Sequence, residues 1–269
     1  MKPITFVVAV NSREIYESNF LASLCFDGIS SHEIIAQEGF QSAARAYNDA
    51  IDKSANDLMI FAHQDILFPA EWLDDLQRAL DVLEEEDANW GVLGCYGEPL
   101  YGTGKGYVYS RGLGVLGKPF DRPAEVQTLD EIVLIIRKSK GLRFNDSLPN
   151  FHFYGADICM AAAKAGMKSY AISAFCIHNS QQNFLLPKGF YESYAIMKQI
   201  WKEALPIRTT CIRITRFDGE VYARRLHELY MRYIRRKEIG ATRVKDGRQL
   251  LREIESAGLT AGNRPSACR

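Results

Sequence analysis

The sequence predicts an α/β fold with a mostly parallel central sheet, flanked by helices and followed by a helical extension. Strand-like and helix-like segments alternate through most of the chain, and this alternation is typical of parallel sheets covered by helices. The strand-like segments are short apolar runs bounded by polar residues, as expected for buried strands. The chain has 269 residues, which is enough for one large α/β domain with an appendage.

The first part of the chain supplies four strands and three helices in alternation. The run at 4–10 is too short to span a membrane and lacks a cleavage pattern, so it predicts a first strand and not a signal peptide. Pro69 suits the first turn of a helix, and leucines at helical spacing follow it. The expected strands lie at 4–10, 33–36, 58–62 and about 90–95, and the expected helices at 13–25, 41–53 and about 70–86.

The segment 97–119 interrupts this alternation and carries seven glycines. Within it, Gly102-Thr-Gly-Lys-Gly106 is not a phosphate-binding P-loop, because no Ser or Thr follows the lysine and no helical pattern comes next. We expect a mobile or hairpin insertion, and long glycine-rich loops of this kind often form a lid near a binding site.

The alternation resumes after this insertion and ends in a basic segment. The pattern predicts strands at 131–137 and 168–177, and helices at 156–166, 189–204, 221–237 and 246–257. The last dozen residues are expected to be disordered. We therefore divide the chain into a domain at 1–206 and a helical extension at 207–269.

The zero net charge hides an asymmetry between these two parts. Residues 1–200 carry 17 Lys and Arg against 25 Asp and Glu, whereas residues 201–269 carry 16 against 8. Two interpretations of the basic extension stay open: it packs on the domain with a solvated charged face, or residues 221–237 contact an anionic membrane surface. A nucleic-acid partner is not expected, because the basic residues are confined to one helix and no recognition motif accompanies them.

The six cysteines form no Cys-x-x-Cys pair, and most lie in apolar surroundings. This usage predicts buried, reduced thiols in a cytoplasmic protein, not a disulfide framework or a zinc site.

Three polar residues, His63, Gln64 and Asp65, follow the predicted strand at 58–62. They fall at the carboxyl end of that strand, where open α/β sheets bind ligands. A carboxylate there can hold a divalent cation and, through it, a diphosphate, and His178 would join Asp65 if the two lie close together. The alternatives are a helix cap for Asp65 and a structural role for His178.

Asp157 lies at the amino end of a predicted helix, next to three aromatic residues in Phe151-His-Phe-Tyr-Gly-Ala-Asp157. It is either a carboxylate favoured by the helix dipole or a general base that takes a proton from an acceptor hydroxyl.

In the order of these elements, residues 3–205 resemble the GT-A fold glycosyltransferases, specifically the family 2-like group. The resemblance depends on Val7-Val-Ala-Val-Asn11, on Ser42-Ala-Ala-Arg-Ala-Tyr-Asn48, on the strand and acid at 60–73, on Phe144-Asn-Asp146, and on Asp157 and His178. His63 departs from the pattern, because it replaces the first acid of the Asp-x-Asp motif, and Ala156 replaces an acid often found beside the base.

This resemblance implies an inverting, metal-assisted transfer from a UDP-sugar to a saccharide or lipid-linked acceptor. Asp65 and His178 would hold Mn²⁺ or Mg²⁺, and Asp157 would be the general base. The implied donor-binding residues are Val10, Asn11, Arg45, His63, Gln64 and Asp65. The implied location is cytoplasmic, with peripheral membrane contact if the basic helix binds lipid.

Two other functions fit the residues less well. A non-catalytic nucleotide-sugar-binding module is suggested by the altered Asp-x-Asp motif. A sugar nucleotidyltransferase would need a glycine-rich basic loop after the first strand, and Asn11-Ser-Arg-Glu-Ile-Tyr contains no glycine.

Overall fold

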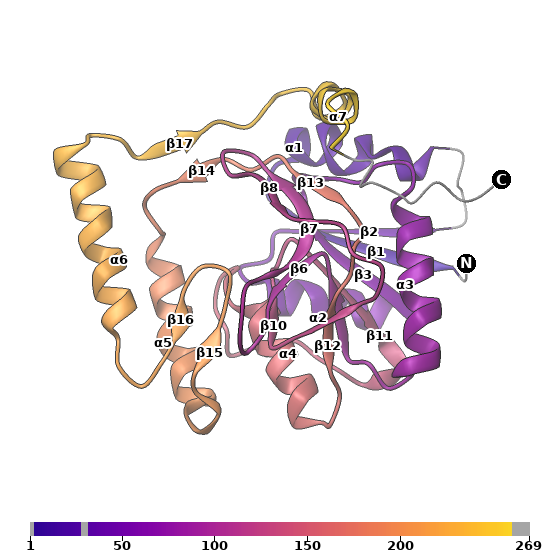
Figure 1. Cartoon of the computed structure of the whole chain (residues 1–269), viewed down its shortest axis with the longest axis horizontal. Helices are drawn as coiled ribbons and strands as arrows, with labels where there is room; N and C mark the ends of the chain where they lie inside the picture. Colours follow the sequence, from indigo (N-terminus) through magenta and orange to yellow (C-terminus); the bar gives the residue numbers. More distant parts are fainter. Residues whose placement is uncertain (1–2, 28–31, 260–269) are drawn as a thin grey trace.

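The computed structural model describes residues 3–27 and 32–259 of the chain (Figure 1). Its central sheet has seven strands in the order β2-β1-β3-β11-β5-β12-β9. Five of these strands run parallel, and β11 and β9 run antiparallel to their neighbours. The bounds are β1 Ile4–Val10, β2 Glu33–Glu38, β3 Leu58–His63, β5 Val92–Gly94, β9 Ala124–Val126, β11 Val133–Arg137 and β12 Ser169–Ala171. The mostly parallel α/β sheet predicted from the sequence is confirmed.

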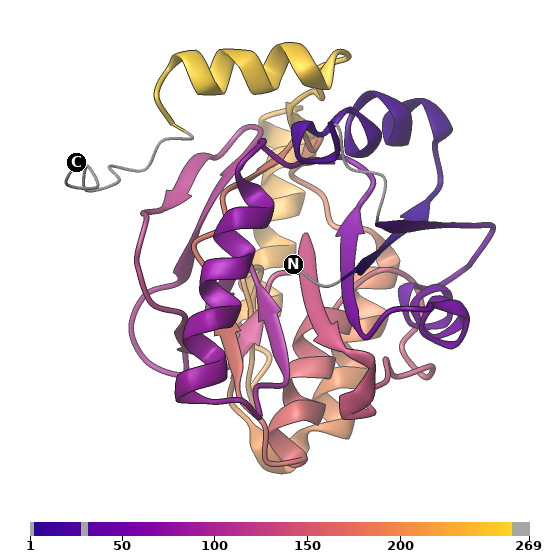
Figure 2. The same ribbon diagram turned by 90° about the vertical axis from the view of Figure 1, so that its right-hand side faces the viewer.

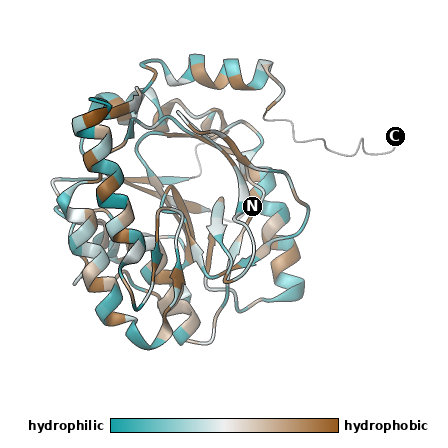
Figure 3. Ribbon diagram, turned by 60° about the vertical axis from the view of Figure 1, so that its left-hand side comes forward, coloured by the Kyte–Doolittle hydropathy of each residue, from teal (hydrophilic) through white to brown (hydrophobic). Residues whose placement is uncertain are grey.

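Helices cover both faces of this sheet because the central strands are apolar on both sides. In β1, Phe6 and Val8 join a core with helix α3, whereas Val7 faces the opposite core with helices α2 and α4. In Figure 3 the inner strands are mostly brown (hydrophobic), whereas the helices have mixed colours because one side of each faces the solvent. The helices are α1 Arg13–Ser18, α2 Ala43–Lys53, α3 Trp72–Glu86 and α4 Tyr154–Lys164.

A second sheet places the ends of two distant strands side by side. Its order is β10-β6-β7-β13-β4, with β8 paired to β7. Strand β4 begins directly after Asp65 and pairs antiparallel with β13, so that His178 lies opposite Ile66. The bounds are β4 Ile66–Leu67, β6 Tyr96–Glu98, β7 Lys105–Ser110, β8 Gly114–Gly117, β10 Thr128–Leu129 and β13 Cys176–His178. The glycine-rich segment thus contains an antiparallel β7–β8 hairpin, which agrees with the hairpin alternative.

The C-terminal part packs back onto the domain. Helix α5 and the β15–β16 hairpin share an apolar cluster, and β17 pairs with β14 near the cavity described below. Helix α7 lies across one end of the molecule (Figure 2), where Leu250, Leu251 and Ile254 contact the second sheet. The bounds are β14 Gln182–Asn183, α5 Lys188–Ile200, β15 Ile207–Arg208, β16 Arg213–Ile214, α6 Gly219–Leu229, β17 Ile239–Ala241 and α7 Gly247–Ser256, with a π-helical turn at Tyr230–Ile234.

Some predicted elements are divided or shortened. The helix expected at 13–25 is α1 followed by 3-10 turns at Phe20–Ala22 and Leu24–Phe26, and the strand expected at 168–177 is β12 and β13. The helices expected at 189–204 and 221–237 end in 3-10 and π-helical turns, at Lys202–Ala204 and Tyr230–Ile234. A further 3-10 turn at Lys138–Lys140 follows β11.

Four of the predicted buried cysteines, at 25, 95, 159 and 176, are buried and free, whereas Cys211 is exposed. Most of the tail expected to be disordered, and Cys268 with it, lies outside the described residues. Among residues 3–27 and 32–259, no helix combines the length and the apolar character that a membrane crossing needs.

Candidate functional site

A cavity of about 830 Å³ lies at the carboxyl ends of β1 and β3. Five of the six predicted donor-binding residues line it: Val10, Asn11, His63, Gln64 and Asp65. Its other walls come from the end of β2 and the loop after it, from Tyr47 of α2, from the segment before α4 and from β14. The cavity therefore lies at the edge of the sheet where the sequence places these residues, and open α/β proteins bind ligands at that edge.

Asp65 is the buried acid at the centre of this site, with 7% of its surface exposed. Its Oδ1 atom lies 3.4 Å from His178 Nε2 and 4.0 Å from His63 Nδ1, and its Oδ2 atom accepts a 2.6 Å bond from Arg243. Burial alone would raise the pKa of the Asp65 carboxyl, but the two imidazoles and the guanidinium outweigh it and hold the pKa below its usual range. Asp65 is therefore ionised at neutral pH.

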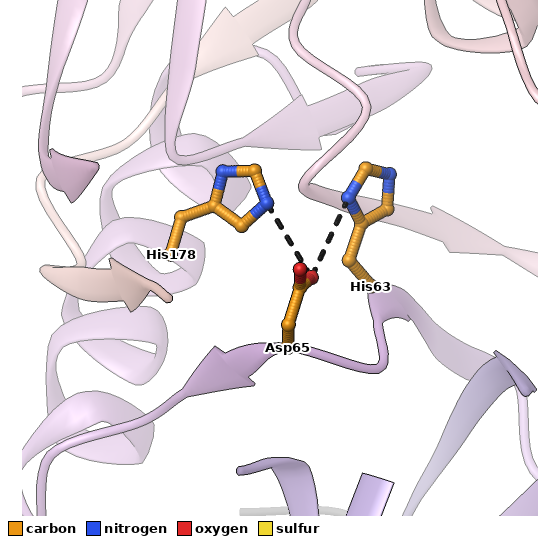
Figure 4. A group of neighbouring side chains, drawn as sticks. All are labelled: His63, Asp65 and His178. Carbon is orange, nitrogen blue, oxygen red and sulfur yellow. Dashed lines mark ion pairs between the residues drawn. The ribbon is translucent and has the colours of Figure 1, made fainter. Parts of the chain in front are cut away.

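The pairing of β13 with β4 brings His178 to Asp65. Asn179 N–H also donates to the Asp65 carbonyl over 2.9 Å, which fixes the two backbones against each other. Burial would lower the pKa of His178, but the Asp65 carboxylate raises it overall. The convergence of residues 65 and 178, which the sequence left conditional, is present in the structure (Figure 4).

The hydroxyl of Tyr154, at the start of α4, orients the His63 ring through the Nε2 atom. The Tyr154 hydroxyl donates to the Glu131 carbonyl over 3.1 Å, so it accepts from His63 Nε2, which lies 3.0 Å away. With its proton on Nε2, the ring presents the Nδ1 lone pair towards Asp65. Burial and the neighbouring His178 both lower the pKa of His63, so this imidazole is neutral at pH 7.

Gln64 connects the ends of β3 and β1. Its Oε1 atom accepts from the backbone N–H groups of Asn11 and Ser12, both over 3.1 Å, and its amide donates to Asn11 Oδ1 over 2.6 Å. These three bonds fix the cavity wall where helix α1 begins, and Asn11 and Gln64 keep polar atoms at that wall.

Asp157 and Arg45 are not among the described residues that line the cavity. Asp157 is 2% exposed, and its Oδ1 atom accepts a 2.7 Å bond from Trp201 Nε1–H. Burial raises the pKa of Asp157, and the bonds from Trp201 and Asn145 offset part of that rise. Arg45 lies on the exposed face of α2. The structure thus separates these two residues from the group around Asp65.

Two residues without a sequence signal complete the site. His152 lines the cavity just before α4, and its ring contacts Phe190 edge to face with centroids 5.6 Å apart. Burial lowers the pKa of His152, so the imidazole is unprotonated at pH 7. Arg243 enters from the C-terminal segment and also lines the cavity. His152 lies in the aromatic segment Phe151-His-Phe-Tyr-Gly-Ala-Asp157, which drew attention to Asp157 instead, and no motif surrounds Arg243.

The donor atoms of His63, Asp65 and His178 fit a divalent cation. One atom from each residue lies within 4.8 Å of the others. Two imidazole nitrogens and one carboxylate oxygen suit Mn²⁺ and other first-row ions. The bond from His63 to the Tyr154 hydroxyl supplies the outer partner that metal-binding histidines usually have. His63 is thus a third ligand candidate, in addition to the two residues predicted from the sequence.

A model of the "Glycosyltransferase like family" matches residues 5–196 of the chain. Among characterised proteins, "ATP synthase subunits region ORF 6" of Fuscovulum blasticum is 33% identical over 155 residues. The aligned part covers 56% of this chain and 61% of that protein, so the chain matches less than two thirds of its relative's length.

Solved structures with a similar arrangement include A197 from STIV and S. aureus TarS. A197 has a TM-score of 0.40 and 17% identity, with 65% of this chain and 83% of that chain covered. TarS residues 1–349 in complex with UDP have a TM-score of 0.47 and 15% identity, with 88% and 73% covered. At this level of similarity, neither structure says what this chain binds.

Proposed function

The chain belongs to the glycosyltransferase-like family, and from this premise we propose that it transfers a sugar from a UDP-sugar to an acceptor hydroxyl. The single observation that carries the proposal is the convergence of His63, Asp65 and His178 beside a cavity large enough for a nucleotide-sugar. The family predicted from the sequence is confirmed by the match. The donor, the metal and the inverting stereochemistry are parts of the proposal.

The nucleoside would lie against the wall formed by Val10, Asn11 and Gln64. Their position at the carboxyl end of β1 supports this placement, and the bonds from Gln64 to the start of α1 hold the wall in shape. Arg45 lies away from the cavity, so its expected role in donor binding stays a prediction.

The diphosphate would lie next to Asp65. His63, Asp65 and His178 would hold Mn²⁺ or Mg²⁺, which when bound would stabilise negative charge on the departing nucleoside diphosphate. The Tyr154 hydroxyl keeps the His63 lone pair directed at this position. Burial of the site reduces the competition from water and strengthens its electrostatic contacts.

Two residues of the chain are candidates for the general base, the group that removes the proton from the acceptor hydroxyl. Asp157 was expected from the sequence, and that assignment stays a prediction. We propose His152 instead, because it lines the cavity and burial keeps its imidazole unprotonated, whereas the Asp157 carboxylate is occupied by Trp201. An imidazole that removes the acceptor proton as the oxygen attacks the anomeric carbon from the opposite face would give inversion.

Calorimetric titration of UDP, with and without Mn²⁺, tests the donor and metal roles together. We expect Mn²⁺-dependent binding in the wild type and at least a tenfold weaker affinity in Asp65→Asn. Asp81→Asn, an exposed acid on α3, is the matched control and should bind as the wild type does. Equal UDP affinity in Asp65→Asn and Asp81→Asn would contradict the metal role.

A non-catalytic nucleotide-sugar-binding module remains the second candidate. His63 in place of an acid and the neutralisation of Asp65 by Arg243 favour it, because both reduce the negative charge available to a cation. Slow hydrolysis of a UDP-sugar by the wild type, lost in Asp65→Asn, would exclude this candidate. Binding without any turnover would favour it.

The basic extension supports a membrane contact at residues 221–237. This segment carries six Lys and Arg against one acid. It also exposes large apolar side chains between the cations, including Leu226 at 67% and Ile234 at 70%. Apolar side chains interspersed with arginines match an anionic lipid surface, which offers both acyl chains and negative charge. We propose that this face of α6 and the π-helical turn binds anionic membranes, where a lipid-linked acceptor would be available.

Vesicle cosedimentation of the full chain tests this contact. We expect binding to vesicles that contain phosphatidylglycerol and little binding to phosphatidylcholine alone. The double variant Leu226→Asp with Ile234→Asp should lose the binding and keep UDP affinity. Equal binding to both vesicles, or a stable dimer that buries this face, would contradict the proposal.

A further inference from the structure

Arg243 is the cation of the C-terminal segment that, among the residues described up to 259, bonds directly to the predicted donor site. Its Nη2 atom donates to Asp65 Oδ2 over 2.6 Å, and its Nε atom donates to the Asn179 carbonyl over 2.9 Å. Arg243 lines the same cavity as Asn11, Gln64 and Asp65. It lies outside the family match, which ends at residue 196. The extension therefore contributes a cavity-lining residue from outside the family match.

The backbone around Arg243 is held in place by a buried asparagine. Asn179 is fully buried, and its amide bonds both backbone groups of Val244: it accepts from the N–H over 2.9 Å and donates to the carbonyl over 2.8 Å. The same amide donates to Asn19 Oδ1 over 2.7 Å. On the other side, Arg111 donates to the Thr242 carbonyl over 3.1 Å. These bonds hold the backbone on both sides of Arg243 in place, so the position of its guanidinium does not depend on a bound ligand.

Helix α7 anchors the segment immediately after Arg243. Leu250, Leu251 and Ile254 are buried against Leu67 and Ile177, in the two strands that carry Asp65 and His178 at their ends. Gly247 packs so closely on the end of α1 that an added Cβ would lie 2.3 Å from the Ser18 carbonyl oxygen. This packing makes the position of Arg243 depend on the same strands as the metal ligands.

The guanidinium keeps donors free in this position. Two of its five N–H groups are used by Asp65 and Asn179. The other three bond no described residue, and the side chain remains one quarter exposed. The other arginine that lines the cavity, Arg13, is paired with Glu17 and Glu38, both at 3.1 Å. Arg243 is therefore better placed to meet an anionic ligand next to Asp65.

We propose that Arg243 binds the diphosphate of the donor, so that the C-terminal extension forms part of the donor site. The inference rests on the proposed function, because the diphosphate is that of the nucleotide-sugar. The planar guanidinium offers paired N–H donors that match phosphate oxygens, and it carries a permanent positive charge. Its bond to Oδ2 leaves Oδ1 of Asp65 directed at the two imidazoles.

Calorimetry on the full chain with Mn²⁺ tests the proposal with three ligands: UDP, uridine and inorganic pyrophosphate. In Arg243→Gln we expect UDP and pyrophosphate affinity to fall at least tenfold and uridine affinity to stay unchanged. Arg243→Lys should recover part of the loss, because it restores the charge. Arg248→Gln is the matched control, since Arg248 also bonds a domain carbonyl, that of Ala22, but lies outside the cavity lining.

A titration of Mn²⁺ without nucleotide separates this role from simple positioning of Asp65. If Arg243 binds phosphate, Arg243→Gln should bind Mn²⁺ as well as or better than the wild type, because a nearby cation has been removed. Weaker Mn²⁺ binding that accounts for the whole loss of UDP affinity would overturn the inference, as would equal losses for UDP and uridine.

The same ligands distinguish failure of this inference from failure of the proposed function. Pyrophosphate binding that depends on Arg243, together with no UDP binding by the wild type, would uphold the inference and reject the UDP donor. UDP binding that is unchanged in Arg243→Gln would reject the inference and leave the donor proposal standing. A wild type that binds neither ligand would reject both.

Discussion

Replacing His152 and Asp157 separately identifies the general base. A general base contributes about 10²–10⁴-fold in rate, which corresponds to about 2.7–5.5 kcal/mol of activation free energy. Because His152 lines the cavity, His152→Gln should lose this factor in kcat. Asp157→Asn should lose less than about tenfold, because the asparagine oxygen can still accept the bond from Trp201 Nε1.

The assay is the initial rate of UDP release from a UDP-sugar, with Mn²⁺ and with water as the acceptor. Calorimetric UDP affinity serves as the control that both variants still bind the nucleotide. The wild-type rate should fall as the pH becomes acidic, since burial places the pKa of His152 below its ordinary value and the neutral imidazole is the active form, and protonation of His178 also removes a metal ligand. A loss of 10²–10⁴-fold in Asp157→Asn, with His152→Gln near the parent rate, would refute this reasoning.

Three further predictions concern the residues that support the site. Tyr154→Phe removes the hydroxyl that orients His63, so Mn²⁺ affinity should fall about 10–100-fold in a spectroscopic titration; unchanged affinity would exclude this supporting role. Leu251→Ala leaves a cavity at a fully buried position on the inner side of α7, so the free energy of unfolding in urea titrations should fall by about 2–5 kcal/mol. A decrease below about 0.5 kcal/mol would mean that α7 is not packed as described. Burial and the neighbouring Asp130 raise the pKa of Glu131 to about 8, so this carboxyl favours folding most at low pH and loses that contribution as pH rises towards 8. Glu131→Gln should therefore be less sensitive to pH between 5 and 8 than the wild type, and parallel stability curves for the two proteins would contradict this sign.

The positions of His63, Asp65 and His178 next to strand ends could be read from the sequence, because an apolar run that stops at a polar residue is a local pattern. The apolar run of β3 stops at His63, and the run of β13 stops at His178, so both imidazoles lie at strand ends. Polar residues at the carboxyl ends of parallel strands in one sheet gather at one edge. Strands β3 and β13 belong to different sheets, so the sequence left the convergence of His178 with Asp65 conditional, and the pairing of β13 with β4 that brings it about is not visible in the sequence.

The direction in which Asp157 points could not be read from the sequence. Helix α4 is buried around most of its circumference, from Tyr154 to Met160, so its hydrophobic pattern does not distinguish the side facing the cavity from the side facing α5. A helix turns by about 100° per residue. Three residues therefore separate Tyr154 and Asp157 by only about 60° around the helix axis, and this offset takes Tyr154 to His63 and Asp157 to Trp201 at the end of α5.

Arg243 was missed for a different reason. It is separated from Asp65 by 178 positions, and its place depends on Asn179, whose bonds to Val244 form only in the folded chain. All arginines of the extension carry the same charge, and no local sequence pattern distinguishes Arg243 from Arg248. Only the tertiary structure distinguishes the arginine at the cavity from those on the surface.

The central claim is that His63, Asp65 and His178 hold one cation against the diphosphate of a nucleotide. The most direct measurement is an anomalous difference map from crystals grown with Mn²⁺ and UDP. We predict a single strong peak bonded to all three side chains and to the diphosphate. A nucleotide bound in the cavity with the manganese peak elsewhere, or with none, would contradict the account.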